Sequence, residues 1–351
     1  MNLPNQHPAD PVLLGGRYLL GERIASGGMG SIFKAIDTQM DREVAVKTLH
    51  PHLSSQPDVR ERFQREATMA AKLVDAHVVA VFDQGDEPYA WIVMELINGP
   101  SLRNVLSVAG PHTPSVVRSV VRPLAVALAR AHEIGIIHRD VKPENVLITL
   151  EGVPKLADFG IADLARPDVA PEDSDLLGSV HYLSPEVING EAASPASDQY
   201  ALGAMTYELL TGLKPLPAST PAEILARHAS EAIPAPSQMM PGLTPEIDHL
   251  VAKMTALRVE DRFSDMRAVA DAIAQAIAGH DEPIQLRQLQ AANHTMMLRR
   301  DQLPAFIPTH QPKRRFSLVW VLLILVVIGA VVWWQYGQDI RWETIVDFFN
   351  G

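Results

Sequence analysis

The sequence of 351 residues contains no cysteine, which excludes disulfide bonds, thiolate metal sites and cysteine nucleophiles. Basic residues are also in deficit, since 30 Lys and Arg stand against 41 Asp and Glu, for a formal net charge of −11. This charge argues against nucleic acid as the main partner. The first ten residues lack an apolar run and predict no secretory signal. The length allows a large core and indicates one two-lobed domain with appendages.

Composition divides the chain into segments of different character. A polar, Pro-rich lead-in precedes a long stretch in which strand-like and helix-like segments alternate without an internal repeat. A segment rich in Gln, Arg, Pro and His follows, with six basic and three acidic residues. We expect a flexible lead-in at 1–16, the main domain at 17–280, a juxtamembrane linker at 281–315, a transmembrane helix at 316–336 and a short extracytoplasmic tail at 337–351.

Residues 316–336 form a run of 21 residues without a charge. At about 1.5 Å per residue this run is about 31 Å long as a helix, which matches the hydrocarbon thickness of a bilayer. The alternative, a buried helix of a soluble domain, is disfavoured because only 15 residues follow to cover it. Basic residues precede the run and aromatic residues lie at its end, as membrane interfaces favour: Lys313, Arg314, Arg315, Trp333, Trp334 and Tyr336. The positive-inside rule then predicts a single-pass inner (cytoplasmic) membrane protein whose main domain is in the cytoplasm.

Residues 138–160, HRDVKPENVLITLEGVPKLADFG, carry the strongest chemical signal in the chain. Asp140, Lys142 and Asn145 share one short loop, and Asp158 follows 13 residues after Asn145. Metal-assisted phosphoryl transfer needs two oxygen ligands, a carboxylate that receives a proton, and a cation that offsets developing charge. This stretch supplies all four groups.

The same stretch resembles the signature of the eukaryotic-type serine/threonine protein kinases in their bacterial form, H-R-D-L-x-x-x-N followed by D-F-G, with Val141 for leucine. The resemblance implies that Asp140 orients the acceptor hydroxyl and takes its proton, while Lys142 meets the γ-phosphate. It assigns Asn145 and Asp158 to Mg²⁺ or Mn²⁺. The implied fold is α+β and bilobal: a small antiparallel β-sheet lobe with one helix, a larger mainly helical lobe, and ATP between them.

The segment 18–37 predicts a strand, a glycine turn and a second strand. Gly27, Gly28 and Gly30 lack side chains, so backbone N–H groups there can approach phosphate oxygens. The family writes this turn G-x-G-x-x-G-x-V, and here Ala25 replaces the first glycine. The resemblance assigns the nucleotide to Ile24, Ala25, Ser26, Gly27, Gly28, Met29, Gly30, Ser31, Ile32, Ala45, Lys47, Glu66, Met94, Glu95, Ile97 and Leu147.

Lys47 interrupts the apolar strand EVAVKTL and matches the family's V-A-I-K lysine. Glu66 lies in a segment of helical period and matches the glutamate that pairs with this lysine and directs it at the α- and β-phosphates. Without the resemblance, both residues would be interpreted as solvated surface charges. Met94 is expected behind the adenine pocket, and backbone groups from Glu95 to Ile97 are expected to bind adenine.

The segment from Asp158 to Glu186 corresponds to the family's activation segment. Glu186 closes the S-P-E that stands for A-P-E, and Arg262 is its expected ion-pair partner. Ser179 is expected to line the acceptor site. The segment contains no threonine, so we expect the carboxylate of Asp173 to replace in part the phosphate that Arg139 normally pairs with, or Ser174 to carry that phosphate.

Three further residues have structural roles by the same resemblance. Asp198 is expected to brace the catalytic loop from below. His138 and Phe159 are expected to pack the two loops together.

The implied function is ATP-dependent phosphorylation of serine and threonine hydroxyls on proteins, including autophosphorylation, in bacterial signalling at the membrane. Expected partners are protein substrates, ATP, the lipid bilayer, a cognate phosphatase and a second kinase copy. An inactive nucleotide-binding receptor is disfavoured because every chemical group is present, and a small-molecule phosphotransferase because S-P-E and Arg262 belong to protein substrates. In the tail, Trp342, Ile345, Val346 and Phe349 share one helical face, which leaves open a frayed end, a partner-binding helix or a helix resting on lipid.

Overall fold

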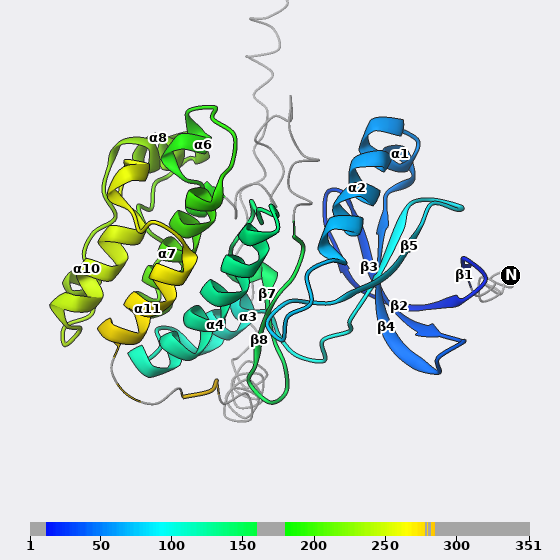
Figure 1. The fold of residues 1–351 in the computed structure, drawn as a ribbon, viewed down its shortest axis with the longest axis horizontal. Helices are drawn as coiled ribbons and strands as arrows, with labels where there is room; N and C mark the ends of the chain where they lie inside the picture. Colours follow the sequence, from blue (N-terminus) through cyan, green and yellow to red (C-terminus); the bar gives the residue numbers. More distant parts are fainter. Residues whose placement is uncertain (1–11, 160–179, 278, 280–281, 285–351) are drawn as a thin grey trace, which may run out of the picture. The chain divides into compact units, whose positions relative to one another are not determined.

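The structure is a computed structural model that describes residues 12–159, 180–277, 279 and 282–284 (Figure 1). The chain divides into two compact units, 1–296 and 297–351, and all described residues belong to the first. The expected transmembrane helix at 316–336 and the tail at 337–351 therefore lie outside the described residues, as do Asp173, Ser174 and Ser179. None of the helices in the described part of the chain combines the length and the apolar character that a membrane span needs.

The small lobe is a six-stranded antiparallel sheet in the order β1-β2-β3-β4-β6-β5. Strand β4 is central and its Val44, Ala45 and Val46 are all buried, as expected for an apolar strand covered on both faces. The strands are β1 (Leu13–Leu14), β2 (Tyr18–Ser26), β3 (Gly30–Asp37), β4 (Arg42–Leu49), β5 (Val81–Gly85) and β6 (Trp91–Met94).

Helix α2 (Pro57–Ala70) packs on this sheet after the short helix α1 (Pro51–Ser54). Its buried residues Phe63 and Ala67 are four positions apart, so they share one face of the helix and enter the cluster that contains Ala45 and Met94. The N–H groups of the first helical turn have no partner within the helix, so proline, which lacks an N–H, is favoured there. This explains why the helix begins at Pro57.

The large lobe is mainly helical and is built around α7 (Pro195–Thr211), in which every residue from Ser197 to Thr211 is buried. Around it lie α3 (Leu102–Ala109), α4 (Pro114–Glu133), α6 (Pro185–Ile188), α8 (Pro221–Ser230), α9 (Pro236–Met239), α10 (Pro245–Met254) and α11 (Met266–Ala276). Short 3₁₀ turns η1 (Pro143–Asn145), η3 (Val180–Tyr182) and η4 (Val259–Asp261) and the hairpin β7 (Val146–Ile148) and β8 (Pro154–Leu156) complete it.

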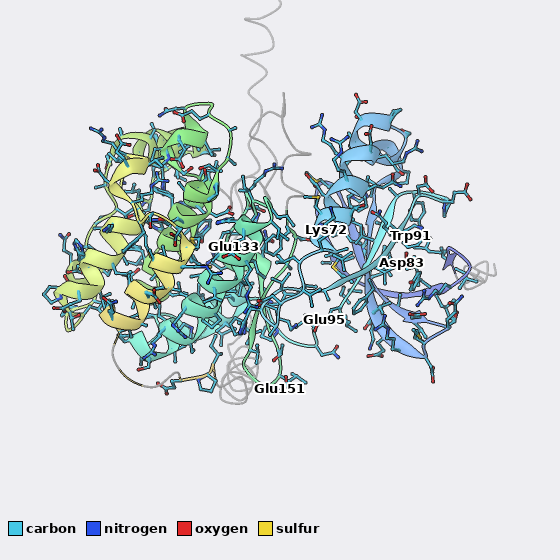
Figure 2. All side chains as sticks on the ribbon, in the orientation of Figure 1. Lys72, Asp83, Trp91, Glu95, Glu133 and Glu151 are labelled. Atoms are coloured by element: carbon cyan, nitrogen blue, oxygen red, sulfur yellow. The ribbon has the colours of Figure 1, made fainter. Side chains whose placement is uncertain are left out.

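The two lobes join through the segment that follows β6. Glu95, labelled in Figure 2, begins this segment: its N–H donates to Ala80 O at 2.8 Å and its carboxylate accepts from Lys155 Nζ at 2.9 Å. Hairpin β7–β8 is linked to the small lobe by the Val79 N–H, which donates to Leu156 O at 2.9 Å. The predicted division into a small sheet lobe and a larger helical lobe is confirmed.

Candidate active site

The catalytic loop closes on itself through Asp140. Asn145 Nδ2 donates to the Asp140 carbonyl oxygen at 2.8 Å and to its carboxylate Oδ2 at 2.9 Å. Lys142 Nζ lies 2.7 Å from the same Oδ2. The three residues grouped from the sequence therefore meet at one carboxylate, which is held in a fixed orientation beside a positive charge.

Asp198, at the start of α7, braces this loop from below as expected. Its Oδ1 accepts from the Arg139 N–H and its Oδ2 from the His138 N–H, both at 2.8 Å. His132 Nε2 also lies 2.8 Å from Oδ2. Arg139 has φ +70°, a left-handed conformation that is unfavourable for a residue with a side chain, and these hydrogen bonds offset its cost.

His138 packs between the two loops, as predicted. Its ring is fully buried, 4.6 Å from the Phe159 ring between centroids. Nδ1 accepts from the Asp140 N–H at 3.2 Å, so the proton resides on Nε2, which donates to Ala157 O at 2.9 Å. Burial lowers the pKa of His138 and keeps the ring neutral, which suits a packing role.

Asp158 approaches the site from the second loop, with φ +62°. Lys47 Nζ lies 2.8 Å from its Oδ1. Burial opposes ionisation of this carboxyl, yet the charge of Lys47 and its hydrogen bond hold the pKa of Asp158 below the ordinary value. The carboxylate is therefore ionised at neutral pH.

The structure differs from the predicted ion pair between Lys47 and Glu66. Lys47 pairs with Asp158, whereas Glu66 Oε1 lies 3.8 Å from Arg139 Nη1. Glu66 lines a cavity of ≈ 250 Å³ together with Arg62, Arg65 and Arg139. The physical reason is electrostatic: Glu66 has the Arg139 guanidinium as a cationic neighbour, while Asp158 is the acid next to Lys47.

The glycine turn is located where the sequence places it, between β2 and β3. The Gly27 N–H donates to Gly30 O at 2.9 Å, and His50 Nε2 lies 3.0 Å from Gly27 O. A Cβ on Gly28 would meet nothing within 4 Å, which is the open backbone that a phosphate requires. A Cβ on Gly30 would lie 1.9 Å from Thr48 O. Gly30 is thus required by the close approach of strand β4, a reason the sequence did not reveal.

The apolar residues assigned to the nucleotide come together in one cluster. Ala45 and Met94 are buried and directly paired across β4 and β6. Met29, Ile32, Ile97 and Leu147 pack against that cluster from the turn, from β3, from the segment after β6 and from β7. The residues at the end of β2, Ile24, Ala25 and Ser26, are exposed instead, while Ser31 is buried, with its Oγ 3.3 Å from Ser26 Oγ.

The two oxygen ligands proposed for a divalent cation fit such an ion. Both hydrogen bonds of the Asn145 amide use its nitrogen, so its oxygen is turned away from Asp140. The Asp158 carboxylate is ionised, and one of its two oxygens lies outside the contact with Lys47. Hard oxygen donors of this kind suit Mg²⁺ and Mn²⁺, which bind to few protein groups and complete their shell with phosphate and water.

The predicted partner of Glu186 is confirmed. Arg262 Nη1 and Nη2 donate to the two carboxylate oxygens at 2.9 and 2.8 Å, and Ser197 Oγ donates to one of them at 3.1 Å. Burial opposes ionisation of Glu186, but the Arg262 guanidinium holds its pKa below the ordinary value. This pair fixes the end of the activation segment against α7 and η4.

Sequence reasoning missed one charged cluster beside the catalytic loop. Arg103 on α3 donates to Glu144 Oε1 at 2.7 Å, to Glu208 Oε1 at 2.6 Å and to the Tyr182 hydroxyl at 2.5 Å. Glu144 belongs to the HRDVKPEN string, so the sequence offered a signal for this residue. Arg103 and Glu208 are 105 residues apart, and no local pattern joins them.

Comparison with known proteins agrees with this geometry. A family model described as "Protein kinase domain" matches residues 18–276. The chain is 36% identical over 319 residues to "Serine/threonine-protein kinase PknL" of Mycobacterium tuberculosis, which covers 88% of this chain and 80% of the relative. It is 38% identical over 278 residues to "Probable serine/threonine-protein kinase PknB" of Corynebacterium glutamicum, covering 75% and 43%. Among solved structures, the Mycobacterium tuberculosis PknI kinase domain aligns with a TM-score of 0.61 at 28% identity, over 77% of this chain and 99% of that one.

Proposed function

We propose that this chain, which belongs to the protein kinase family, transfers the γ-phosphoryl group of ATP to serine and threonine hydroxyls of proteins, its own included. The proposed setting is bacterial signalling at the membrane. One observation carries the proposal: Asn145 and Lys142 hold the Asp140 carboxylate, and Lys47 holds Asp158 on the neighbouring loop. The groups held in this way are of the kinds that phosphoryl transfer requires, namely a proton acceptor, two cations and two oxygen ligands for a metal ion, and this supports the proposal.

Each side chain then has a chemical task. The Asp140 carboxylate orients the acceptor hydroxyl and receives its proton, while the Lys142 ammonium 2.7 Å away offsets negative charge on the γ-phosphate. Lys47 binds the α- and β-phosphates. Asn145 and Asp158 would hold Mg²⁺ or Mn²⁺, which would supply positive charge beside the phosphates.

The nucleotide site follows from the apolar cluster and the turn. Adenine packs against Ala45, Met94 and Leu147, and its edge binds the backbone of Glu95 and Ile97. Residues 24–32 cover the phosphates, with Gly28 open to them.

The remaining parts of the proposal concern the membrane. Residues 316–336 anchor the chain, residues 281–315 link the anchor to the kinase domain at 17–280, and that domain faces the cytoplasm. The lipid bilayer, a cognate phosphatase and a second kinase copy are its proposed partners besides the substrate.

The central claim is tested by replacing Asp140 with asparagine in the full chain. Transfer of radiolabelled phosphate from ATP to protein should fall about 10²–10⁴-fold while nucleotide binding persists, because only the proton acceptor is lost. Asp86→Asn, an exposed change in the turn after β5, is the matched control. Transfer by Asp140→Asn at the control's rate, or product that is not phosphoserine or phosphothreonine, would contradict the proposal.

A further inference from the structure

The Arg103 cluster is an ion network next to the substrate side of the catalytic loop. Arg103 lies in the first turn of α3 and joins three other elements: η1 through Glu144, η3 through Tyr182 and α7 through Glu208. Its Nη2 also lies 3.2 Å from Glu208 Oε2, so every nitrogen of the guanidinium is engaged. The Tyr182 hydroxyl in turn donates to Glu208 Oε2.

The cluster is joined to the catalytic loop beside Asp140, the residue proposed to receive the acceptor's proton. Glu144 directly precedes Asn145, whose amide bonds the Asp140 carboxylate at 2.9 Å. Tyr182 is three residues after Ser179, the residue expected to line the acceptor site. A substrate peptide whose hydroxyl reaches Asp140 therefore carries its neighbouring side chains past Glu144.

The recess carries one net negative charge with Arg103 in place and would carry two without it. Two carboxylates, Glu144 and Glu208, face one guanidinium, and burial raises the pKa of the Tyr182 phenol so that it stays neutral. Glu208 is 4% exposed, whereas Glu144 is 36% exposed, although its Oε2 is buried and has no hydrogen-bond partner among the described residues. A buried carboxylate needs a paired cation, and a guanidinium matches two carboxylates better than an ammonium does.

We propose that Arg103 is a specificity-determining residue: it fills from within the chain an acidic recess, formed by Glu144, Glu208 and Tyr182, that would otherwise bind a lysine or arginine side chain of the substrate beside the phosphorylated residue. The inference rests on the proposed function, because it concerns the protein substrate of the same site. A basic residue at that position of the substrate accordingly does not raise the phosphorylation rate of the wild-type kinase. A chain without the guanidinium has two uncompensated carboxylates there and selects such a residue.

The test uses a peptide library in which each position around a serine acceptor carries arginine or alanine in turn. Full-length wild type, Arg103→Met and the double variant Arg103→Met/Glu144→Gln are compared for phosphorylation rate at each position. Wild type should show an arginine-to-alanine ratio near one at every position. Arg103→Met should raise that ratio about tenfold at one or two positions, equal to about 1.4 kcal/mol, and the double variant should lose most of the gain.

A merely structural role for Arg103 makes a different prediction. It would lower the rate on all peptides equally and leave the arginine-to-alanine ratios unchanged, which would overturn the inference. If Arg103→Met does not fold, Arg103→Gln keeps hydrogen-bond donors for Glu208 and Tyr182 without the charge and must show the same gain. A wild type that phosphorylates no peptide or protein would refute the proposed function, whereas a wild type that already selects arginine at the position gained by the variant would refute only this inference.

Discussion

Replacing Asp198 by asparagine should separate the support of the catalytic loop from general stability. The carboxylate is 1% exposed and accepts from two backbone N–H groups, those of His138 and Arg139, at 2.8 Å. Asparagine keeps one acceptor oxygen and turns an NH₂ group toward the other donor. One buried N–H then loses its partner.

The cost can be worked from these contacts. An unpaired buried donor costs about 1–3 kcal/mol, so Asp198→Asn should lose about that much stability. Alanine would strand both N–H groups and cost about 2–6 kcal/mol, a large share of the total of about 5–15 kcal/mol for a folded domain. A shift of about 1 Å in the loop that carries Asp140 is enough to lower the transfer rate roughly 10²-fold.

The assay compares Asp198→Asn with Asp248→Asn in the full chain, by thermal unfolding and by phosphate transfer below both melting temperatures. Asp248 is a matched control because it accepts from the Ser237 N–H at 2.9 Å and from Ser237 Oγ at 2.5 Å, away from the catalytic loop. Both variants should lose stability, but only Asp198→Asn should lose activity. Equal activity of the two variants would show that Asp198 does not position the loop.

Two other outcomes are expected. Stability should fall as the pH drops from 6.5 to 4, because burial lowers the pKa of His228 from 6.5 to about 4 and the unfolded chain takes up a proton that the folded chain does not. The loss is about 3 kcal/mol at pH 4, and thermal unfolding against pH should give a flatter slope for His228→Gln than for wild type; identical slopes would refute this reasoning. Removing residues 313–351 should release the kinase from membranes with its transfer activity intact, as measured by sedimentation with vesicles, and continued sedimentation would exclude 316–336 as the sole anchor.

The local sequence was sufficient to predict contacts between groups that are neighbours in the chain. Asp140, Lys142 and Asn145 lie within six residues, so the short loop that joins them also brings their side chains together. The pairs Glu186–Arg262 and Asp198–His138 span 76 and 60 residues, and they were predicted only because the family resemblance supplied the fold.

Other contacts depend on how the folded chain packs, which no sequence motif specifies. Lys47 meets Asp158, 111 residues away, rather than Glu66, because the partner of an ammonium is decided by which carboxylate the packed lobes bring nearest. Gly30 was selected correctly but for a different reason, since the contact that excludes a Cβ is with Thr48 O on the adjacent strand. Both facts are properties of packing and register.

The burial of helix α7 affects which parts of the large lobe can unfold locally. It supplies Asp198 to the catalytic loop, Ser197 to the Glu186 pair and Glu208 to the Arg103 cluster, and all three residues are buried. Local unfolding releases only segments with few buried contacts, so a helix buried along its length opens with the whole lobe. The amide protons of His138 and Arg139 therefore exchange with solvent only through the rarest openings of the large lobe. The groups that receive the substrate share the kinetic protection of its core, whereas the exposed glycine turn over the nucleotide does not.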